Sequence, residues 1–461
     1  MQNITEQARN LNFTTSGKQT KKILFANFPA DGHFNPLTGL AMQLKARGFE
    51  VAWYSSNTYK QKLAKLQIKH YPFKKAVDVS NNDFDNTFPG RKKCKTQVGK
   101  LKFDIIHAFI LRAPEYYADL QELYKEFPFD LMIADVAFTG IPFVKELMKI
   151  PVISVGVFPL SETSKDLPPS GLGMIPSASF AGKLKQSLLR SIANSFIFGG
   201  PNKVMFDMFK TYNVPHNNES LFDMMIKKSD LLLQSGTPGF EYRRSDLSNN
   251  IRFIGPLLPY TSNNIATSWF DERLNKFEKI VLVTQGTVEK DIEKILVPTL
   301  RAFKNTNTLV IATTGGNNTQ ELRDRFTDHN FIIEDFIPFA DAMPYADVYV
   351  TNGGYGGVLL GIENRLPLVV AGVHEGKNEI NARVGYFKLG INLRTETPRP
   401  EEMRTAIEEI FSNNMYKNNV TKLAREFSEY DGQKLFSKYL NDILYPATAK
   451  IKMAAQQIPV N

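Results

Sequence analysis

The sequence predicts an α/β protein built from two Rossmann-like domains, each with its own parallel sheet. Three observations predict this class. The chain has 461 residues, too many for one hydrophobic core and suited to two domains of roughly 200 residues. Hydrophobic residues make up 43% and charged residues 22% of it, as in ordinary globular proteins. Apolar strand-like runs alternate with helix-like segments in two successive series, which is typical of βαβ units.

The first series of elements begins at residue 22. Residues 22–28 (KILFANF) form a predicted strand, a turn-rich PADGHFNP follows, a helical pattern then ends at Gly48, and Glu50–Ser55 is the next strand. This close succession indicates parallel strands joined by a helix. Further strands of the same sheet are predicted at residues 130–136, 151–157 and 230–236, with a helix at residues 141–148.

Residues 160–212 interrupt this alternation. LPPSGLGMIP is predicted to be a loop and AGKLKQSLLRSIANSFIFGG an irregular amphipathic helical region, and such an insertion is a natural place for a pocket or a lid. Residues 253–264 (FIGPLLPYTSNN) then have the proline and asparagine density of a linker between domains.

A second parallel sheet is predicted after the linker. Its strands are expected at residues 279–287, 308–316, 331–338, 347–354 and 367–373, and residues 399–444 have a helical pattern. The expected organisation is a flexible extension at 1–20, a first domain at 21–255, a linker at 256–278, a second domain at 279–425, a C-terminal helix at 426–445 that packs back on the first domain, and a tail at 446–461.

Cysteine content and hydropathy predict the compartment. Cys94 is the only cysteine, which excludes an intramolecular disulfide and a four-cysteine zinc site and fits a reducing compartment. No segment approaches the roughly 18 apolar residues of a membrane-spanning helix, and the N-terminus lacks the apolar core of a signal peptide. We therefore expect a soluble cytoplasmic protein that acts as a monomer or weak dimer.

The chain is basic, with a net charge of +9, which can favour nucleic acid or an anionic membrane as a partner. Its lysines are too scattered to decide between these partners, and we expect no nucleic-acid partner. A local cluster at Arg91, Lys92, Lys93 and Lys95 is typical of a solvated loop, and it leaves a peripheral membrane contact open.

Two residues at predicted strand ends have side chains suited to proton transfer. His33 follows the first strand, and an imidazole with an unperturbed pKa of about 6.5 is a competent proton acceptor near neutrality. Asp135 ends a later strand of the same sheet, so its carboxylate can hold the tautomer of that imidazole. Taken alone, His33 is more often a loop or helix-capping residue, and Asp135 fits a turn former as well.

Residues 351–357 (TNGGYGG) form a predicted glycine-rich loop between a strand and a helix. Glycines let the backbone approach an anion closely, and the free amides at a helix start favour a diphosphate. The pattern does not match GxGxxG, and GVHEGK at residues 372–377 misses the Walker spacing by one residue. A plain dinucleotide site or phosphate loop is therefore disfavoured.

Together these segments resemble family 1 of the glycosyltransferases, the UDP-glycosyltransferase superfamily, and within it the bacterial macrolide and natural-product branch. The resemblance spans both halves of the chain, with the segments FPADGHFNPLTGLAMQLKARGFEV, IADVAF, FIGP, VTQGT and DFIPFADAMPYADVYVTNGGYGGVLLGIENRLPLVVAGVHEGKNEINARV. It implies the GT-B fold, in which two Rossmann-like domains face each other across a cleft.

The resemblance also implies roles for particular residues. His33 matches the catalytic base and Asp135 the carboxylate that orients it. The residues expected to bind the donor are Gly32, Gly286, Thr287, Phe336, Pro338, Asn352, Gly353, Gly354, Tyr355, Gly356, Gly357 and Glu375. The residues expected to contact the acceptor are Phe34, Phe138 and Phe158. Each of the donor residues also has a packing or turn interpretation.

The activity that the resemblance implies is inverting transfer of a hexose to a hydroxyl of a small hydrophobic acceptor. UDP-glucose is the expected donor, and a dTDP-deoxysugar is the alternative. We expect no cofactor and no metal, because backbone amides and the helix dipole can stabilise the leaving diphosphate. Asp83 and Asp85 form a D-x-D triplet, but it lies in a polar stretch away from any predicted strand end, so no metal is expected there.

Two departures from the family pattern keep other functions open. Many relatives carry His where this chain has Asn352, and a ribose-binding Glu where it has Leu360. These changes favour a non-catalytic nucleotide-sugar-binding protein, whereas the retention of His33 and Asp135 argues against it. A nucleotide-sugar epimerase would share the architecture, and the GHFNP loop argues against that function.

Overall fold

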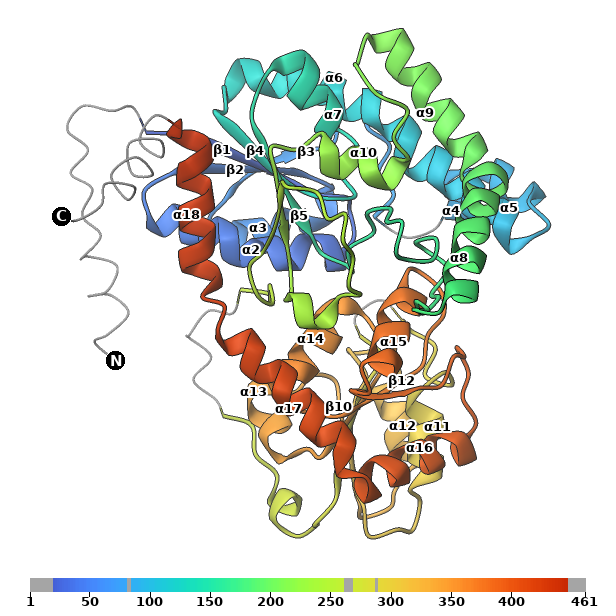
Figure 1. The fold of residues 1–461 in the computed structure, drawn as a ribbon. Helices are drawn as coiled ribbons and strands as arrows, with labels where there is room; N and C mark the ends of the chain where they lie inside the picture. Colours follow the sequence, from blue (N-terminus) through green and yellow to red (C-terminus); the bar gives the residue numbers. More distant parts are fainter. Residues whose placement is uncertain (1–19, 81–83, 261–267, 287–288, 447–461) are drawn as a thin grey trace, which may run out of the picture.

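Two α/β domains lie one above the other in the structure (Figure 1). It is a computed structural model that describes residues 20–80, 84–260, 268–286 and 289–446. The expected N-terminal extension and C-terminal tail fall almost wholly outside these ranges. The named strands of both sheets pair in parallel, which confirms the predicted fold class.

The first domain contains a seven-stranded sheet with the strand order β3-β2-β1-β4-β5-β6-β7. Its strands are β1 (Lys22–Ala26), β2 (Glu50–Ser55), β3 (Lys69–Pro72), β4 (Leu131–Asp135), β5 (Val152–Gly156), β6 (Leu231–Gln234) and β7 (Ile251–Phe253). The central strands β1 and β4 are almost completely buried, as their unbroken apolar runs predict. The edge strands β3 and β7 were not predicted from the sequence.

Helices cover both faces of this sheet. One face packs against α2 (Asp31–Ala46) and α18 (Gly432–Leu444), whose Phe436 and Leu440 are fully buried. The other face packs against α6 (Ala113–Glu126). α18 belongs to the far end of the chain and returns to the first domain as the red helix of Figure 1. The other helices here are α3 (Lys60–Lys65), α4 (Phe84–Thr87), α5 (Gln97–Asp104), α7 (Ile141–Phe143) and α10 (Leu221–Lys227).

The second domain contains a six-stranded sheet with the order β10-β9-β8-β11-β12-β13. Its strands are β8 (Ile280–Thr284), β9 (Leu309–Thr313), β10 (Phe331–Glu334), β11 (Val348–Thr351), β12 (Leu368–Val370) and β13 (Gly390–Asn392). Its helices are α11 (Leu296–Ala302), α12 (Thr319–Arg325), α13 (Phe339–Ala342), α14 (Tyr355–Glu363), α15 (Lys377–Tyr386), α16 (Pro400–Ser412) and α17 (Asn414–Ser428). The last strand, β13, was not predicted.

A helical insertion lies between β5 and β6 of the first domain. It consists of α8 (Phe180–Ile192), a π-helical turn η6 (Ala193–Ile197) and α9 (Gly199–Tyr212). Ala193 and Phe198, at the junction of these helices, share a buried cluster with Ile105, which follows α5. The insertion is thereby packed onto the first domain beside α5, on the right-hand side of Figure 1.

The chain passes between the two domains twice, and the two passages touch. The first is the linker, of which residues 261–267 lie outside the described ranges, and the second joins α17 to α18. A Cβ on Gly255 would lie 2.9 Å from Cβ of Tyr430, and a Cβ on Gly432 would lie 2.8 Å from the carbonyl oxygen of Ile254. Glycine at these two positions therefore allows the passages to lie against each other.

Candidate active site

His33 and Asp135 meet at the carboxyl edge of the first sheet. Asp135 is the last residue of β4, and His33 lies in the first turn of α2, shortly after β1. His33 Nδ1 is 2.7 Å from Asp135 Oδ1. Because a carboxylate only accepts hydrogen bonds, Nδ1 carries the hydrogen, so in the neutral imidazole the lone pair is on Nε2. Within the described residues Nε2 forms no hydrogen bond, and the His33 side chain is partly exposed.

Backbone amides hold the Asp135 carboxylate in place. Phe28 N donates to Oδ2 at 2.6 Å, and Ala137 N donates to Oδ1 at 2.8 Å. The side chain of Asp135 has no exposed surface. Three donors around a buried carboxylate compensate its charge and fix its orientation toward His33.

α2 begins earlier than the sequence indicated. PADGHFNP was expected to be a turn, yet the helix starts at Asp31. The carbonyl oxygen of Ala30 accepts hydrogen bonds from the amides of His33 and Phe34, at 2.9 and 3.0 Å, and this closes the first helical turn. Pro36 lies inside the helix and removes one N–H donor without ending it. His33 is therefore fixed by a helical turn rather than held on a loop.

The glycine-rich segment forms the carboxyl edge of the second sheet. It follows β11 and leads into α14, with Gly354 at the N-cap. Asn352 joins two neighbouring strand ends: its Nδ2 donates to the carbonyl oxygen of Gln285 after β8, and its Oδ1 accepts from Gly354 N at 3.2 Å. The loops after β8 and β11 thus form one cluster.

Gly353 and Gly356 shape the start of α14. Gly353 has a φ of +84°, and a Cβ there would lie 1.8 Å from Asn381 Oδ1, so only glycine fits. Nothing lies within 4 Å of a Cβ on Gly356. The first backbone N–H groups of a helix lack intrahelical partners, and the helix dipole is positive at this end. The open start of α14 is therefore suited to an anion such as a phosphate.

Other predicted donor residues lie at the ends of strands in the same sheet. Gly286 follows β8, where a Cβ would lie 3.7 Å from Asn352 Nδ2. Phe336 follows β10 with 71% of its surface exposed, and its ring lies 3.4 Å from the position of a Cβ on Gly316. Pro338 caps the start of α13. Thr287 lies outside the described residues.

Three predicted donor residues have less distinctive surroundings. Gly32 is exposed in the first turn of α2, and nothing lies within 4 Å of a Cβ there. Gly357 lies within α14 in ordinary contact with Tyr349. Glu375 lies in the exposed loop after β12, and its Oε2 is 2.8 Å from Lys377 Nζ. Its carboxylate thus takes part in a local ion pair.

Tyr355 begins α14, and its side chain points away from the open helix start, so only its backbone amide is available to a donor. The ring is buried, and its hydroxyl donates to the carbonyl oxygen of Ser235 in the first domain at 2.7 Å. Burial raises the pKa of Tyr355 well above its usual value, so the hydroxyl stays protonated and remains a donor. α14 also lies against α2. These contacts fix the helix that carries the glycine loop against the helix that carries His33.

Two of the three predicted acceptor contacts are core residues instead. Phe34 stacks on Tyr59 with 4.2 Å between ring centroids, and Phe138 stacks on Tyr116 at 4.6 Å. Both phenylalanine side chains are completely or almost completely buried. Phe34 follows His33 in α2, and its ring points into the core because each helical residue is rotated by about 100° from the one before it. Phe138 lies in the turn after β4, and its ring packs back under the sheet.

Aromatic rings surround His33 on two sides. The ring of Phe158, a predicted acceptor contact, has its centroid 6.1 Å from that of His33. Phe28 lies at 5.4 Å from His33 and stacks on Phe109 at 4.4 Å. Sequence reasoning missed Phe28 and Phe109. The position of Phe28 directly after a buried strand was a usable signal, whereas Phe109 had none.

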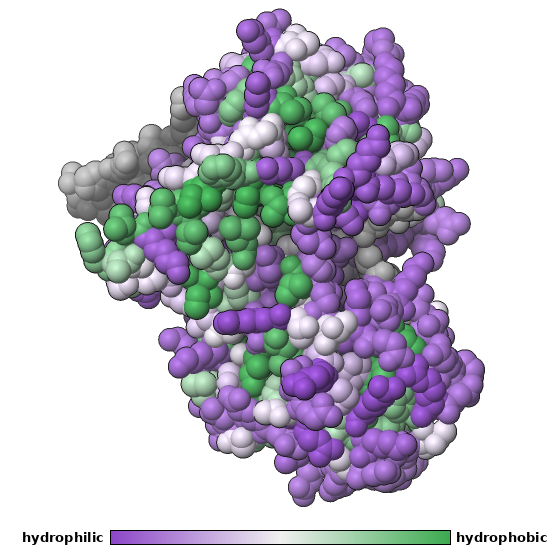
Figure 2. All heavy atoms as spheres, turned by 90° about the vertical axis from the view of Figure 1, so that its right-hand side faces the viewer, coloured by the Kyte–Doolittle hydropathy of each residue, from purple (hydrophilic) through white to green (hydrophobic). Residues whose placement is uncertain are grey.

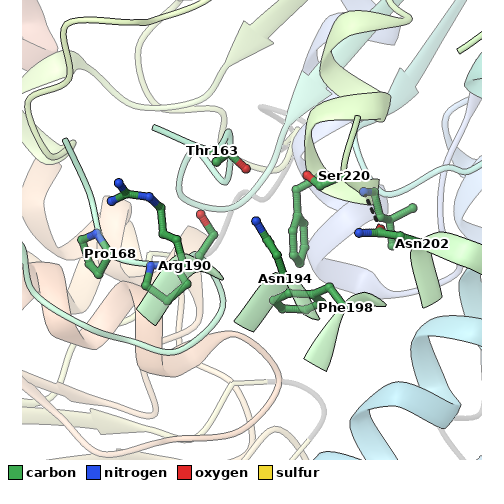
Figure 3. A pocket seen from close by; sticks show the side chains of 11 residues that line it. Thr163, Pro168, Arg190, Asn194, Phe198, Asn202 and Ser220 are labelled. Carbon is green, nitrogen blue, oxygen red and sulfur yellow. Dashed lines mark hydrogen bonds between the residues drawn. The ribbon is translucent and has the colours of Figure 1, made fainter. Parts of the chain in front are cut away.

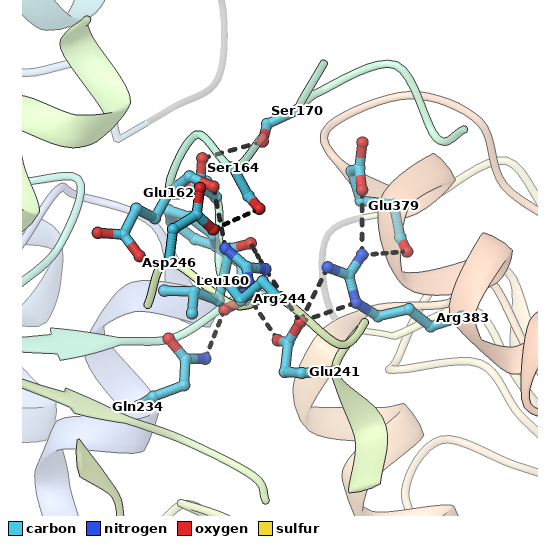
Figure 4. A network of polar contacts seen from close by, with 12 residues as sticks. Leu160, Glu162, Ser164, Ser170, Gln234, Glu241, Arg244, Asp246, Glu379 and Arg383 are labelled. Atoms are coloured by element: carbon cyan, nitrogen blue, oxygen red, sulfur yellow. Dashed lines mark hydrogen bonds and ion pairs between the residues drawn. The ribbon is translucent and has the colours of Figure 1, made fainter. Parts of the chain in front are cut away.

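A polar network joins the domains on the side of α15 (Figure 4). Arg383 is buried and places Nη2 2.9 Å from Glu241 Oε2 and Nη1 3.0 Å from Glu379 Oε2. Burial opposes its charge, but the two carboxylates together raise the pKa of Arg383 above its usual value. Glu379 also accepts hydrogen bonds from the amides of Gly171 and Gly173, both at 2.8 Å. The loop before α8 is thereby tied to the second domain.

A pocket lies between α8, α9 and the loop after β5 (Figure 3). Its lining residues are Thr163, Pro168, Pro169, Ser170, Arg190, Asn194, Phe198, Asn202, Ser220, Leu221 and Phe222. His33 is not among them, so this pocket is separate from the immediate surroundings of the imidazole.

Side chains that could hold a metal are not grouped in the part of the chain that the structure describes. No cluster of three or more His, Cys, Asp or Glu residues occurs within those ranges. Asp85 is ion-paired with Arg91, with 2.8 Å between Oδ1 and Nη1. Asp83, the other carboxylate of the D-x-D triplet, lies outside the described residues.

Comparison with known proteins agrees with the fold and with the family resemblance. The 4'-demethylrebeccamycin synthase of Lentzea aerocolonigenes is 30% identical over 89% of this chain and 96% of its own length. UDP-glucosyltransferase 1 of Beauveria bassiana is 28% identical over 88% of this chain and 91% of its own. The solved structure of a calicheamicin glycosyltransferase superposes on this chain with a TM-score of 0.71 and 18% sequence identity. The match covers 93% of this chain and 99% of that protein, and it supports the GT-B fold.

The family itself is shown by the sequence. A family model described as UDP-glucoronosyl and UDP-glucosyl transferase matches residues 117–429, which include Asp135 and the whole glycine-rich segment. The chain is therefore a nucleotide-sugar-dependent glycosyltransferase and belongs to the UDP-glucoronosyl and UDP-glucosyl transferase family.

Proposed function

We propose that this protein transfers glucose from UDP-glucose to a hydroxyl of a small hydrophobic acceptor, with inversion at the anomeric carbon. The observation that carries the mechanism is the 2.7 Å contact between His33 Nδ1 and Asp135 Oδ1, which leaves Nε2 with a free lone pair. The choice of glucose is supported by the name of the Beauveria bassiana relative, a UDP-glucosyltransferase.

His33 is the general base of this reaction. The acceptor O–H gives its proton to His33 Nε2 while its oxygen forms a bond to the anomeric carbon. The bond between that carbon and the phosphate oxygen breaks, and UDP leaves with the electron pair. Asp135 stabilises the imidazolium and keeps Nδ1 protonated. Attack from the face opposite the phosphate inverts the configuration.

The second domain stabilises the leaving diphosphate. The backbone amides and the helix dipole at the start of α14 would stabilise the negative charge of the diphosphate. The glycines let the phosphates approach the backbone. Gly353 is essential to this shape because of its positive φ and the nearby Asn381. The exposed ring of Phe336, beside Gly316, offers a flat surface for the nucleobase.

The acceptor side is apolar. Phe28 and Phe158 flank His33, and Phe109 extends this surface by stacking on Phe28. Such rings favour a flat hydrophobic molecule whose hydroxyl reaches Nε2. The name of the Lentzea aerocolonigenes relative, 4'-demethylrebeccamycin synthase, also supports a natural-product acceptor.

The experiment combines a donor panel with an acceptor panel in the presence of a chelator. Purified protein is incubated with UDP-glucose, other UDP-hexoses and a dTDP-deoxysugar, each with phenolic, polyketide and sterol acceptors, and sugar adducts are detected by mass spectrometry. We expect glucose transfer from UDP-glucose, and NMR should show a β-linked product from the α-linked donor. Retained configuration would rule out single displacement, and nucleotide binding without any transfer would favour the non-catalytic alternative.

A further inference from the structure

An unbroken stripe of large apolar side chains runs along the outer face of α8 and η6. Its members are Phe180, Leu184, Leu188, Ile192 and Phe196, with exposed fractions of 86%, 66%, 60%, 43% and 72%. They recur at every fourth residue, so each lies about 40° round the helix from the one before, and together they form a slanting stripe. Isolated exposed leucines are ordinary, but a contiguous patch of this kind marks an interaction site.

The opposite side of the same segment is fixed to the protein. Gln186 and Ala193 are buried, and Gln186 accepts a hydrogen bond from Ser177 N while its Nε2 donates to the carbonyl oxygen of Asp166. Arg190 donates to the carbonyl oxygen of Leu167. α8 is therefore held in this orientation, and its apolar stripe faces outward in the folded chain.

Positive charge borders the stripe. At about 100° per residue, Lys183 and Lys185 lie on either side of it, and both are exposed. Residues 167–206 contain Lys183, Lys185, Arg190 and Lys203 but no Asp or Glu. The stripe thus lies in a segment whose charged residues are all cationic.

A second cationic segment lies on the same side of the first domain. Residues 86–103 contain Arg91, Lys92, Lys93, Lys95, Lys100 and Lys102 and no acidic residue. Asp85 and Asp104, the last residue of α5, flank this segment and both pair with Arg91, so its lysines carry the excess positive charge. Val98 and Leu101 of α5 are also exposed. Ile105, just after α5, packs with Ala193 at the end of α8. Figure 2 looks onto this side and shows apolar side chains gathered on the upper domain among hydrophilic ones.

We propose that the outer face of α8, together with the lysines of α5, docks the enzyme onto the surface of an anionic lipid bilayer. An apolar helix face bordered by lysines is the pattern of helices that lie in the membrane interface, where the apolar side chains enter the lipid and the cations meet anionic headgroups. None of the helices in the described ranges combines the length and apolar composition needed to cross a bilayer. Docking therefore takes place at the surface.

Charge argues against a second copy of the chain as the occupant. A two-fold interface brings the same surface of both copies together. Lys183 and Lys185 would then face their own equivalents, and neither residues 86–103 nor residues 167–206 offer a carboxylate to pair with them. An anionic membrane satisfies both the apolar and the cationic part of this face.

Docking through α8 would bring the pocket between α8 and α9 close to the membrane. Arg190, Asn194 and Phe198 line the pocket from the same helical segment that presents the stripe on its outer side. A docked enzyme would hold this pocket next to the lipid, where an apolar molecule is most concentrated.

Vesicle binding tests the proposal without any need for transferase activity. The full-length protein is sedimented with vesicles of phosphatidylcholine alone or mixed with phosphatidylglycerol, at low and high salt. We expect binding to the mixed vesicles, weaker at high salt because ions screen the lysines. Absence of binding to the mixed vesicles at low salt would overturn the proposal.

Paired variants separate the apolar and cationic contributions. Lys183→Glu/Lys185→Glu should reduce the partition coefficient at least about 25-fold, since each lysine near an anionic surface contributes about fivefold. Its control is Lys417→Glu/Lys422→Glu, which changes the net charge equally on exposed residues of α17 and should still bind.

The apolar variant is Leu184→Ser/Leu188→Ser, which should lose at least about tenfold in partition, because two buried leucines leave the lipid. Its control, Phe270→Ser/Tyr345→Ser, removes two exposed rings, one from the linker and one from the second domain, and should bind as the unaltered protein does. Circular dichroism checks that all variants are folded.

Two other outcomes would assign the stripe differently and overturn membrane docking. A concentration-dependent dimer in light scattering that disappears in Leu184→Ser/Leu188→Ser, without vesicle binding, would make this face an interface between copies. A fall in kcat with a water-soluble acceptor in the same variant, again without vesicle binding, would make α8 part of an acceptor lid.

Discussion

The contact between His33 and Asp135 is made by two residues 102 positions apart in the chain. Asp135 ends β4 and His33 lies in the helical turn shortly after β1, and neighbouring parallel strands bring their carboxyl ends to one edge of a sheet. That rule made the pair predictable. The directions of neighbouring side chains could not be predicted in the same way. Phe34 points into the core, whereas the His33 side chain beside it is partly exposed.

Replacing His33 by Ala should separate chemistry from donor binding. We expect kcat to fall about 10²–10⁴-fold because the general base is lost. The affinity for UDP, measured by titration calorimetry, should stay unchanged, since the diphosphate is proposed to rest on the second domain. His329→Ala, an exposed histidine of that domain, is the control. Equal turnover in both variants would remove His33 from the mechanism.

Gly353→Ala and Gly356→Ala form a matched pair. Gly353 has a φ of +84°, and an added Cβ would meet Asn381 Oδ1 at 1.8 Å, whereas Gly356 lies in α14 with open space beside it. We expect Gly353→Ala to cost about 1–3 kcal/mol from backbone strain alone. Gly356→Ala should be neutral or slightly stabilising because alanine favours helix. Thermal unfolding measures both, and equal melting temperatures would contradict the description of this loop.

At the scale of elements, sequence reasoning located the central strands and missed those at the sheet edges. β4 and β8 are buried on both faces and therefore read as unbroken apolar runs. β3, β7 and β13 are short and carry His70, Arg252 and Asn392, so neither their length nor their composition marks a strand. The early start of α2 was hidden because Gly, Asn and Pro are typical of turns.

α18 is an element whose contribution to stability can be measured. Phe436 is completely buried in the core of the first domain, although the helix follows the second domain in sequence. Phe436→Ala should cost about 3–5 kcal/mol in the free energy of unfolding. Gln433→Ala, on the exposed side of the same helix, should cost little. A loss for Phe436→Ala no larger than that for Gln433→Ala, measured in urea, would contradict the stabilising role of this buried contact.

At the scale of the whole molecule, Arg383 and Glu241 link the two domains across 142 positions of sequence. No motif or periodicity indicates such a pair, so it could not be predicted. Arg383→Met should cost about 3–5 kcal/mol because the buried Glu241 would lose its close ion pair and keep only Arg244, at 4.0 Å, to offset its charge. Adding Glu241→Gln should recover part of the lost free energy of unfolding, because burying a neutral amide costs less free energy than burying an unpaired carboxylate. Stability of Arg383→Met equal to that of the unaltered protein would contradict this role.

The touching passages near Gly255 and Gly432 restrict how the halves can move. Because the two covalent connections lie against each other at Gly255 and Gly432, we expect any rotation between the domains to be centred there. α15 lies well away from this point, on the opposite side of the molecule (Figure 1). The hydrogen bonds from the amides of Gly171 and Gly173 to Glu379 lie far from this point, so a small rotation there would separate their atoms by the largest distance. We expect these hydrogen bonds to break before the two domains can move apart.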